Sequence, residues 1–154
     1  MIFEKEKTCA FTGHRILGGD FDENKLLSVV TELIGRGYDT FLVGMAIGFD
    51  TACYKLLEFL RGKFKIRLIA CIPCEQQDLK FDIKQKTEYR KMLASADEKI
   101  YVSKEYTKTC MFKRNMFMVD NASVLIAYLK NDKGGTYNTV KYAERKGVNI
   151  IMIN

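Results

Sequence analysis

Tryptophan is absent from this chain of 154 residues, and proline and histidine each occur once, as Pro73 and His14. No proline-rich linker, repeat or low-complexity tract divides the sequence. Apolar runs fall well short of the roughly 18 residues that a membrane span needs, and residues 1–7 lack the apolar centre of a signal peptide. Because 47% of the residues are apolar, intrinsic disorder is excluded. We expect residues 1–154 to form one cytoplasmic domain that does not bind a membrane.

The five cysteines do not form a recognisable framework. Their odd number argues against complete disulfide pairing, so free thiols are expected in a reducing compartment. Cys71 and Cys74 have the Cys-x-x-Cys spacing of thioredoxin, but Cys71 falls inside an apolar run that is typical of a strand. A structural zinc site usually has four ligands, and the sequence has no second cysteine pair. We expect no structural disulfide, no metal and no required cofactor.

The net charge of +6 is a weak signal. A positive charge suits an anionic partner, but lysine and arginine are spread from Lys5 to Lys146, and acidic residues are interleaved with them. Surfaces that bind single-stranded nucleic acid usually combine a basic groove with aromatic side chains, and no dense basic stripe is present here. The charge pattern favours an ordinary solvated surface over a dedicated nucleic-acid interface.

Strand-like and helix-like segments alternate along the chain. Short apolar runs rich in β-formers predict six strands, at residues 8–12, 40–43, 66–72, 99–102, 123–128 and 148–153. Helical spacing predicts helices at residues 51–61, 83–94, 111–121 and 136–146. The first helix lies between Asp22, placed to cap it, and Gly35 and Gly37, placed to end it; its apolar stripe is Leu26, Leu27, Val29, Val30, Leu33 and Ile34.

This alternation determines the predicted fold class. Single helices between near-continuous apolar strands indicate parallel pairing, because right-handed crossovers lay helices over both faces of the sheet. We predict an α/β fold with a doubly wound, mainly parallel Rossmann-like sheet. Residues 103–110 have no clear periodicity and are expected at the rim of the site.

Four loops follow predicted strands at what should be one edge of the sheet, where ligands bind in such folds. They are Gly13-His14-Arg15, residues 44–50, Pro73-Cys74-Glu75 and Gly134-Gly135-Thr136. Glycine lets the backbone approach a ligand, and the amides at the start of the following helix favour an anion. Gly134-Gly135-Thr136 is therefore the predicted phosphate loop. Asp50 is a candidate for a ribose hydroxyl, although helix capping explains Asp50 and Thr136 about equally well.

Known nucleotide-binding fingerprints are not matched. Residues 13–20 have the glycine spacing of a P-loop, but Gly19-Asp20 stands where that loop needs Lys and Ser or Thr. No Gly-x-Gly-x-x-Gly follows the first predicted strand. An ATPase and an ordinary Rossmann dinucleotide site are both disfavoured.

His14 has three interpretations. It can bind a phosphate or base, carry a proton together with Glu75, or organise its own loop through a backbone contact. Ligand contact is the favoured interpretation. For the proton-carrying role, His14 and Glu75 are the candidate catalytic residues.

Five motifs in order resemble the YpsA-like family of the SLOG superfamily, to which DprA and the Lonely Guy phosphoribohydrolases belong. They are Phe-Thr-Gly-His-Arg at 11–15, Gly-Met-Ala-x-Gly-x-Asp at 44–50, Pro-Cys-Glu-x-Gln at 73–77, Arg-Asn-x-x-Met-Val-Asp at 114–120 and Gly-Gly-Thr-x-x-Thr-Val at 134–140. The resemblance implies a Rossmann-like domain that binds a nucleotide-derived ligand. Its matched ligand-binding positions are Gly13, His14, Arg15, Gly44, Met45, Gly48, Asp50, Arg114, Asp120, Gly134, Gly135 and Thr136.

One departure separates this chain from the Lonely Guy enzymes. Those enzymes carry a catalytic glutamate in Pro-Gly-Gly-x-Gly-Thr-x-x-Glu, whereas here Lys133 replaces the proline and residues 136–141 contain no carboxylate. Glu75 is then the candidate general acid or base for an alternative function, hydrolysis of the N-glycosidic bond of nucleoside monophosphates.

Three functions are therefore considered: a nucleotide sensor or carrier, which we favour, an N-glycosidic hydrolase, and, by analogy with DprA, a single-stranded DNA-binding module. Aromatic residues Phe112, Phe117 and Tyr89 are interpreted as core or interface residues. Met111, Met116 and Met118 suggest an adaptable surface that could serve a homo-oligomer.

Overall fold

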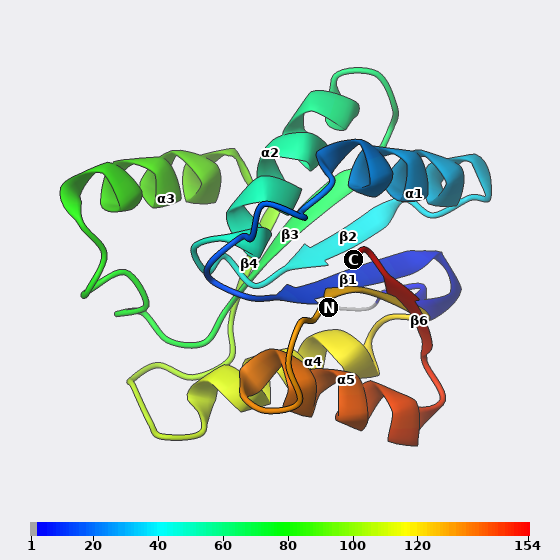
Figure 1. The fold of residues 1–154 in the computed structure, drawn as a ribbon. Helices are drawn as coiled ribbons and strands as arrows, with labels where there is room; N and C mark the ends of the chain where they lie inside the picture. Colours follow the sequence, from blue (N-terminus) through cyan, green and yellow to red (C-terminus); the bar gives the residue numbers. More distant parts are fainter. Residues whose placement is uncertain (1–2) are drawn as a thin grey trace.

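The computed structural model describes residues 3–154 as a parallel six-stranded sheet with five α-helices (Figure 1). The strands pair in the order β4-β3-β2-β1-β5-β6, and every pairing is parallel. The strands are β1 (Thr8–Gly13), β2 (Thr40–Val43), β3 (Arg67–Ile72), β4 (Glu98–Tyr101), β5 (Val124–Tyr128) and β6 (Asn149–Met152). The helices are α1 (Glu23–Gly35), α2 (Phe49–Arg61), α3 (Ile83–Ser95), α4 (Cys110–Asp120) and α5 (Gly135–Lys146).

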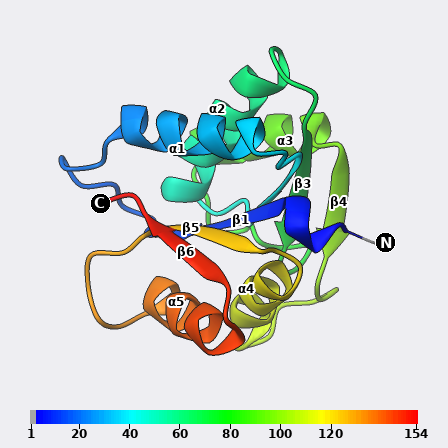
Figure 2. The ribbon, with the colours of Figure 1, turned by 90° about the vertical axis from the view of Figure 1, so that its right-hand side faces the viewer.

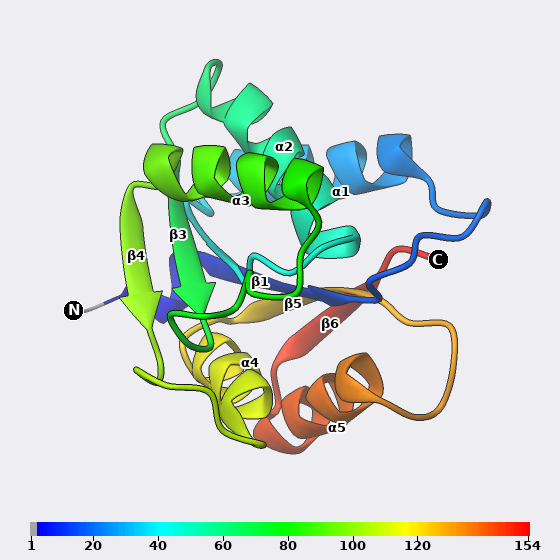
Figure 3. The same cartoon turned by 90° about the vertical axis from the view of Figure 1, so that its left-hand side faces the viewer.

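Helices cover both faces of the sheet. Helices α1, α2 and α3 lie on one face, and α4 and α5 lie on the other (Figures 1 and 3). The chain moves from β1 outward to β4, then crosses back to β5 beside β1, so the winding direction reverses between β1 and β5. The predicted doubly wound parallel sheet is confirmed.

Residues of the central strands alternate between two hydrophobic layers, because successive side chains of a strand point to opposite faces. In β1, Cys9 and Phe11 pack into the layer beneath α1–α3, whereas Ala10 packs into the layer above α4 and α5. Ala127 of β5 also faces α4 and α5. Both faces are buried, which explains why β5 is apolar throughout and why the core positions 9–11 of β1 are apolar.

Predicted boundaries agree with the structure to within two residues. The helix predicted at residues 51–61 begins two residues earlier, at Phe49, and the others differ by one residue or less at each end. Asp22 caps α1 as predicted, since its carboxylate accepts a hydrogen bond from the Lys25 amide at 3.1 Å. A short 3-10 helix at Lys5–Lys7 was not predicted.

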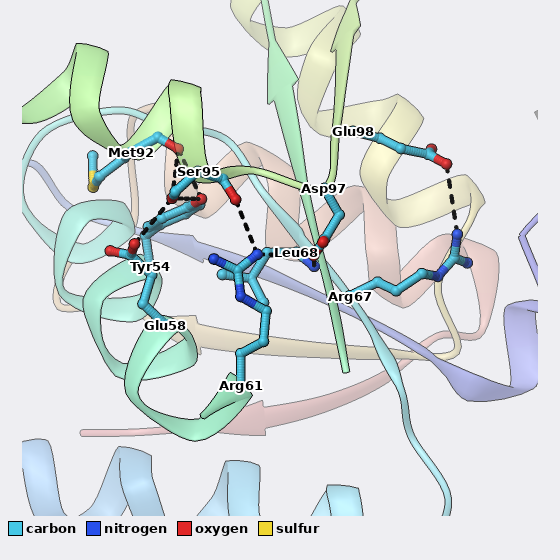
Figure 4. A network of polar contacts seen from close by, with 9 residues as sticks. All are labelled: Tyr54, Glu58, Arg61, Arg67, Leu68, Met92, Ser95, Asp97 and Glu98. Atoms are coloured by element: carbon cyan, nitrogen blue, oxygen red, sulfur yellow. Dashed lines mark hydrogen bonds and ion pairs between the residues drawn. The ribbon is translucent and has the colours of Figure 1, made fainter. Parts of the chain in front are cut away.

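At the amino ends of β3 and β4, side chains of α2 and α3 form a polar network (Figure 4). The Tyr54 and Ser95 hydroxyls lie 2.7 Å apart, and Ser95 donates to Glu58 at 2.9 Å. Arg61 donates to the Asp97 carboxylate at 3.0 Å, and the same Asp97 oxygen accepts the Leu68 amide at 2.8 Å. These contacts join both helices to the start of the outer strands.

All five cysteines are free and buried. Cys71 lies within β3, as its apolar surroundings predict. Within residues 3–154, no helix is both long enough and apolar enough to span a membrane.

Candidate functional site

The loops that follow β1 and β5 lie side by side at the carboxyl edge of the sheet, where the winding reverses (Figures 2 and 3). Side-chain contacts fix the first loop to the second. The Tyr128 hydroxyl accepts a hydrogen bond from the Gly18 amide and donates to Asp20, each at 3.0 Å. Lys130 forms an ion pair with Asp20 at 2.7 Å. Asp20, which breaks the P-loop pattern, thus holds its own loop in place.

His14 makes a third connection between these loops. Its Nε2 accepts a hydrogen bond from the Lys130 amide at 2.9 Å, and its carbonyl accepts one from the Phe49 amide at 3.1 Å. Nε2 can accept this bond only in the tautomer that carries its proton on Nδ1. The backbone contact that was one of three interpretations of His14 is therefore present.

A cleft of about 630 Å³ opens between these loops and the amino ends of α4 and α5, and we call it the glycine-loop cleft. Its lining includes cationic and amide side chains around a floor formed by the end of β1. The lining residues are Phe11, Thr12, Gly13, His14, Arg15, Ala46, Asp50, Met111, Arg114, Asn115, Asn131, Lys133, Gly134, Gly135 and Thr136.

The amino end of α5 forms one wall of this cleft. Gly134 is the N-cap residue, with φ 96°, and it has no side chain to accept hydrogen bonds from the first-turn amides. Such amides, together with the helix dipole, favour an anion. A Cβ at Gly134 or Gly135 would meet nothing within 4 Å, so open space lies beside this turn. Thr136 follows as a buried residue in the first turn.

Arg114 crosses from α4 to the ends of two strands behind the cleft. Its Nη1 donates to the carbonyl oxygens of Gly44 and Cys71, and its Nε donates to Asn115 Oδ1 at 2.8 Å. Only 5% of Arg114 is exposed. Its Nη2 makes one hydrogen bond within residues 3–154, to Met111 Sδ at 3.9 Å, which leaves one N–H donor for a ligand.

Asp50 is the only carboxylate in the lining of the glycine-loop cleft. It is 7% exposed and accepts the Ala46 amide at 3.1 Å, so it closes its own loop instead of capping α2, whose N-cap is Gly48. Burial raises the pKa of Asp50 to about 6, although the positive charge of Arg114 opposes part of this effect. A carboxyl group with a pKa near neutrality in a cleft is a mark of functional sites.

Two glycines, Gly44 and Gly48, allow the loop after β2 to pack closely against neighbouring side chains and backbone. A Cβ at Gly44 would lie 2.7 Å from Arg114 Nη1 and 2.9 Å from Asp50 Oδ2. Gly48 has φ 82°, and a Cβ there would collide with the backbone of Arg15. These glycines bring the loops after β1 and β2 together and let the guanidinium approach the backbone.

Residues 23–154 match the YpsA family model, the YspA SLOG family. This chain belongs to the YpsA family of the SLOG superfamily. It is also 32% identical over 137 residues to the SPbeta prophage-derived protein YoqJ of Bacillus subtilis (strain 168), and the alignment covers 80% of each chain.

Two solved structures have the same fold as this YpsA-family chain. DNA processing protein A (DprA) from Streptococcus pneumoniae has a TM-score of 0.69 at 17% identity, over 96% of this chain and 50% of that one. DNA processing protein A from Helicobacter pylori, whose structure describes a single-stranded DNA binding mode, has a TM-score of 0.70 at 14% identity. That match covers 97% of this chain and 66% of the H. pylori chain. The YpsA-family chain thus spans half to two thirds of these proteins.

Most predicted site residues of this YpsA-family chain meet at the glycine-loop cleft. The residues brought together are Gly13, His14, Arg15, Asp50, Arg114, Gly134, Gly135 and Thr136. Gly44 and Gly48 shape the loop behind the cleft, and Met45 is 1% exposed in the hydrophobic core with φ 65°.

Asp120 and Glu75 are not brought to the cleft. Asp120 ends α4, far from the helix's amino end at the cleft, and accepts a hydrogen bond from the Tyr142 hydroxyl at 2.7 Å. Glu75 is exposed and lines neither this cleft nor the neighbouring one described below. The role of Glu75 as a general acid or base stays a prediction, because its side chain does not line the glycine-loop cleft.

Sequence reasoning missed three polar residues of the cleft, Asn115, Asn131 and Lys133. Asn131 and Lys133 lie within the three residues before the glycine pair, so their position between β5 and the phosphate loop was a usable signal. Asn115 is the second residue of the motif at 114–120, so its place beside Arg114 was also a usable signal. No group of three His, Cys, Asp or Glu within residues 3–154 could hold a metal ion.

Proposed function

We propose that this YpsA-family protein binds a nucleotide or nucleotide-derived ligand, with a phosphate held in the glycine-loop cleft. The observation that carries the proposal is the meeting of the uncapped amino end of α5 with three cationic side chains, Arg15, Arg114 and Lys133, in one cleft. Helix amides and guanidinium groups both favour phosphate oxygens.

The position of the cleft supports the same proposal. In doubly wound sheets, ligands bind outside the carboxyl ends of the strands where the strand order reverses, and this cleft lies there, between β1 and β5. Polar side chains such as Asn131 and Asp50 offer hydrogen bonds to ribose hydroxyls beside the phosphate loop.

A thermal-shift screen against nucleoside mono-, di- and triphosphates, ADP-ribose, nicotinamide dinucleotides and cyclic nucleotides tests the proposal, because a ligand of the folded state raises the melting temperature. We expect one class of nucleotide to raise the melting temperature, and we expect Thr136→Ala to abolish that shift. A screen in which no nucleotide stabilises the protein would reject the proposal. Release of free base from a stabilising nucleotide would instead make the protein a hydrolase.

Single-stranded DNA is a second candidate ligand, favoured by the fold shared with the H. pylori DprA protein. The cations of the glycine-loop cleft suit a nucleic-acid backbone as well as a single phosphate. Oligonucleotide binding that weakens steeply with salt, with no stabilisation by mononucleotides, would favour the DNA-binding function.

A further inference from the structure

A second cleft, of about 620 Å³, lies beside the glycine-loop cleft, and we call it the glutamine cleft after Gln77 in its lining. It is built from the loops after β2, β3 and β4 and the start of α3. Arg15, Ala46 and Met111 belong to the lining of both clefts, so the two spaces adjoin. A ligand longer than a phosphate sugar can therefore extend from one into the other.

The lining of the glutamine cleft has more large apolar and aromatic side chains than that of the glycine-loop cleft. Its walls include Ile47, Phe81, Tyr106 and Met111, and Leu79 stands at its rim with 69% of its surface exposed. Tyr106, in the irregular loop predicted at the rim, is 66% exposed. Large apolar side chains left in water at a cleft mark a surface for a ligand. Apolar and aromatic side chains suit contact with a planar ring.

Gln77 supplies a polar group that the protein leaves unpartnered. The residue is 7% exposed, and its Nε2 donates to the Gly44 carbonyl at 3.2 Å. Since a carbonyl can only accept, this contact fixes the orientation of the amide and identifies Oε1 as the other atom. Oε1 is buried and has no hydrogen-bond partner within residues 3–154. An unpaired buried acceptor is costly, so a ligand whose N–H pairs with Oε1, after the amide rotates toward the cleft, relieves that cost.

The Gly44 carbonyl connects the two clefts. It accepts hydrogen bonds from Arg114, which lines the glycine-loop cleft, and from Gln77, which lines the glutamine cleft. The Arg114 guanidinium and the Gln77 amide are therefore positioned relative to each other by one backbone oxygen.

We infer that the glutamine cleft is the base subsite of the ligand whose phosphate occupies the glycine-loop cleft, with an N–H of the base donated to Gln77 Oε1. This inference rests on the proposed function. The base lies against Tyr106 and Met111, and Arg15 stands where the two clefts meet. The ligand class is thus a nucleotide with an intact base, not a sugar phosphate or inorganic phosphate.

Calorimetric titration of the purified protein with AMP, GMP, CMP and UMP, each compared with ribose 5-phosphate, separates the two subsites. We expect one nucleotide to bind about tenfold or more tightly than ribose 5-phosphate, the effect of one buried hydrogen bond and ring contacts. In Gln77→Met, which keeps side-chain length without the acceptor, that advantage should fall to about threefold or less. Affinity for ribose 5-phosphate should stay unchanged.

Two variants make the comparison decisive. Thr136→Ala acts on the phosphate side and should weaken ribose 5-phosphate and the nucleotide by the same factor. Tyr106→Ala alters an exposed side chain whose loss does not threaten folding, and it should lower the nucleotide's advantage only. It therefore tests the base subsite even where Gln77→Met fails to fold.

The outcomes also separate this inference from the proposed function. Binding of ribose 5-phosphate with no added affinity for any nucleotide would overturn the base subsite and leave the phosphate site intact. Equal weakening of both ligands by Gln77→Met would do the same. Failure of every phosphate compound to bind would reject the proposed function, and the base subsite with it.

Discussion

The polar groups at the two edges of the sheet find their hydrogen-bond partners in opposite ways. At the amino edge, the hydroxyls of Tyr54 and Ser95, the Arg61 guanidinium and the Asp97 carboxylate bind one another or the backbone (Figure 4). Glu98 departs from this pattern, because one of its oxygens is buried without a hydrogen bond while the other lies 3.6 Å from Arg67.

At the carboxyl edge, polar groups border open clefts. Arg114 keeps donor capacity, Asp50 is a buried carboxylate and Gln77 Oε1 has no partner among the described residues. Polar groups that pair within the protein add stability, whereas groups kept for a ligand cost stability until the ligand arrives. Substitutions at the two edges should therefore separate stability from binding.

Arg114→Met should have the largest effect, since Arg114 holds the carbonyls of Gly44 and Cys71 and offsets the Asp50 charge. Losing the hydrogen bonds of a buried charged group and leaving a buried carboxylate without a nearby cation costs about 3 kcal/mol. We expect urea unfolding to show a loss of that order, together with loss of nucleotide binding. Arg114→Met combined with Asp50→Asn should be more stable than Arg114→Met alone, because no buried carboxylate remains. Identical stabilities would show that Asp50 and Arg114 are not coupled.

Ionisation of Asp50 should produce the next largest effect, a change of the unfolding free energy with pH. Its pKa of about 6 lies above the usual value, so the folded state binds this proton more tightly than the unfolded chain does. The stability that the proton gives is present at pH 4 and is lost as the pH rises through 6. The unfolding free energy of wild type relative to Asp50→Asn should therefore fall between pH 4 and 7 in urea titrations.

The same ionisation should affect binding. ADP-ribose is the suitable probe, because it lacks the phosphomonoester group that titrates near pH 6. A neutral Asp50 does not repel phosphate, so affinity should increase up to about tenfold as the pH falls from 7.5 to 5.5. Asp50→Asn should flatten this profile in calorimetric titrations, and an unchanged slope would place the responsible group elsewhere.

Ser95→Ala tests the amino edge. The substitution removes the hydroxyl that joins Tyr54 to Glu58 and should cost about 1 kcal/mol of unfolding free energy. Nucleotide affinity should not change, because this network lies at the opposite edge from both clefts. A Ser95→Ala protein with normal stability and weakened binding would contradict the division of roles between the edges.

A matched pair of charge reversals gives the smallest expected effect. Lys133→Glu at the glycine-loop cleft and Lys65→Glu before β3 both alter exposed side chains, so neither should change stability by more than about 0.5 kcal/mol. Only Lys133→Glu should weaken binding of a nucleotide, by about fivefold and less at high salt. Equal effects of the two reversals would indicate general attraction by net charge.

The sequence predicted the fold well because hydrophobic periodicity records burial directly. Strands such as Val124–Tyr128, buried on both faces, read as continuous apolar runs, and the caps and glycines marked helix ends. The meeting of the four loops followed from parallel pairing alone. The start of α2 was predicted late because Gly48, with its positive φ, places Phe49 in the first turn.

Side-chain roles within the site were harder to predict. Asp120 was grouped with Arg114 by motif, yet α4 runs away from the cleft, and its length of about 15 Å places its last residue near the other edge. The direction of this helix in the predicted fold was enough to place Asp120 away from the cleft. The pairing of Arg114 and Gln77 with the Gly44 carbonyl depends on tertiary contacts over 70 and 33 residues of sequence, which no local pattern encodes.

Because the cysteines are buried, their reactivity toward a thiol reagent can be used to follow unfolding of this protein. Burial raises the pKa of Cys71 to about 12 and that of Cys9 further, so thiolates are scarce in the folded state. Cys9, Cys53 and Cys71 lie inside the two hydrophobic layers, so a thiol reagent in the solvent reaches them only when a layer separates. The reaction rate of these three thiols therefore follows local and global unfolding without any added label.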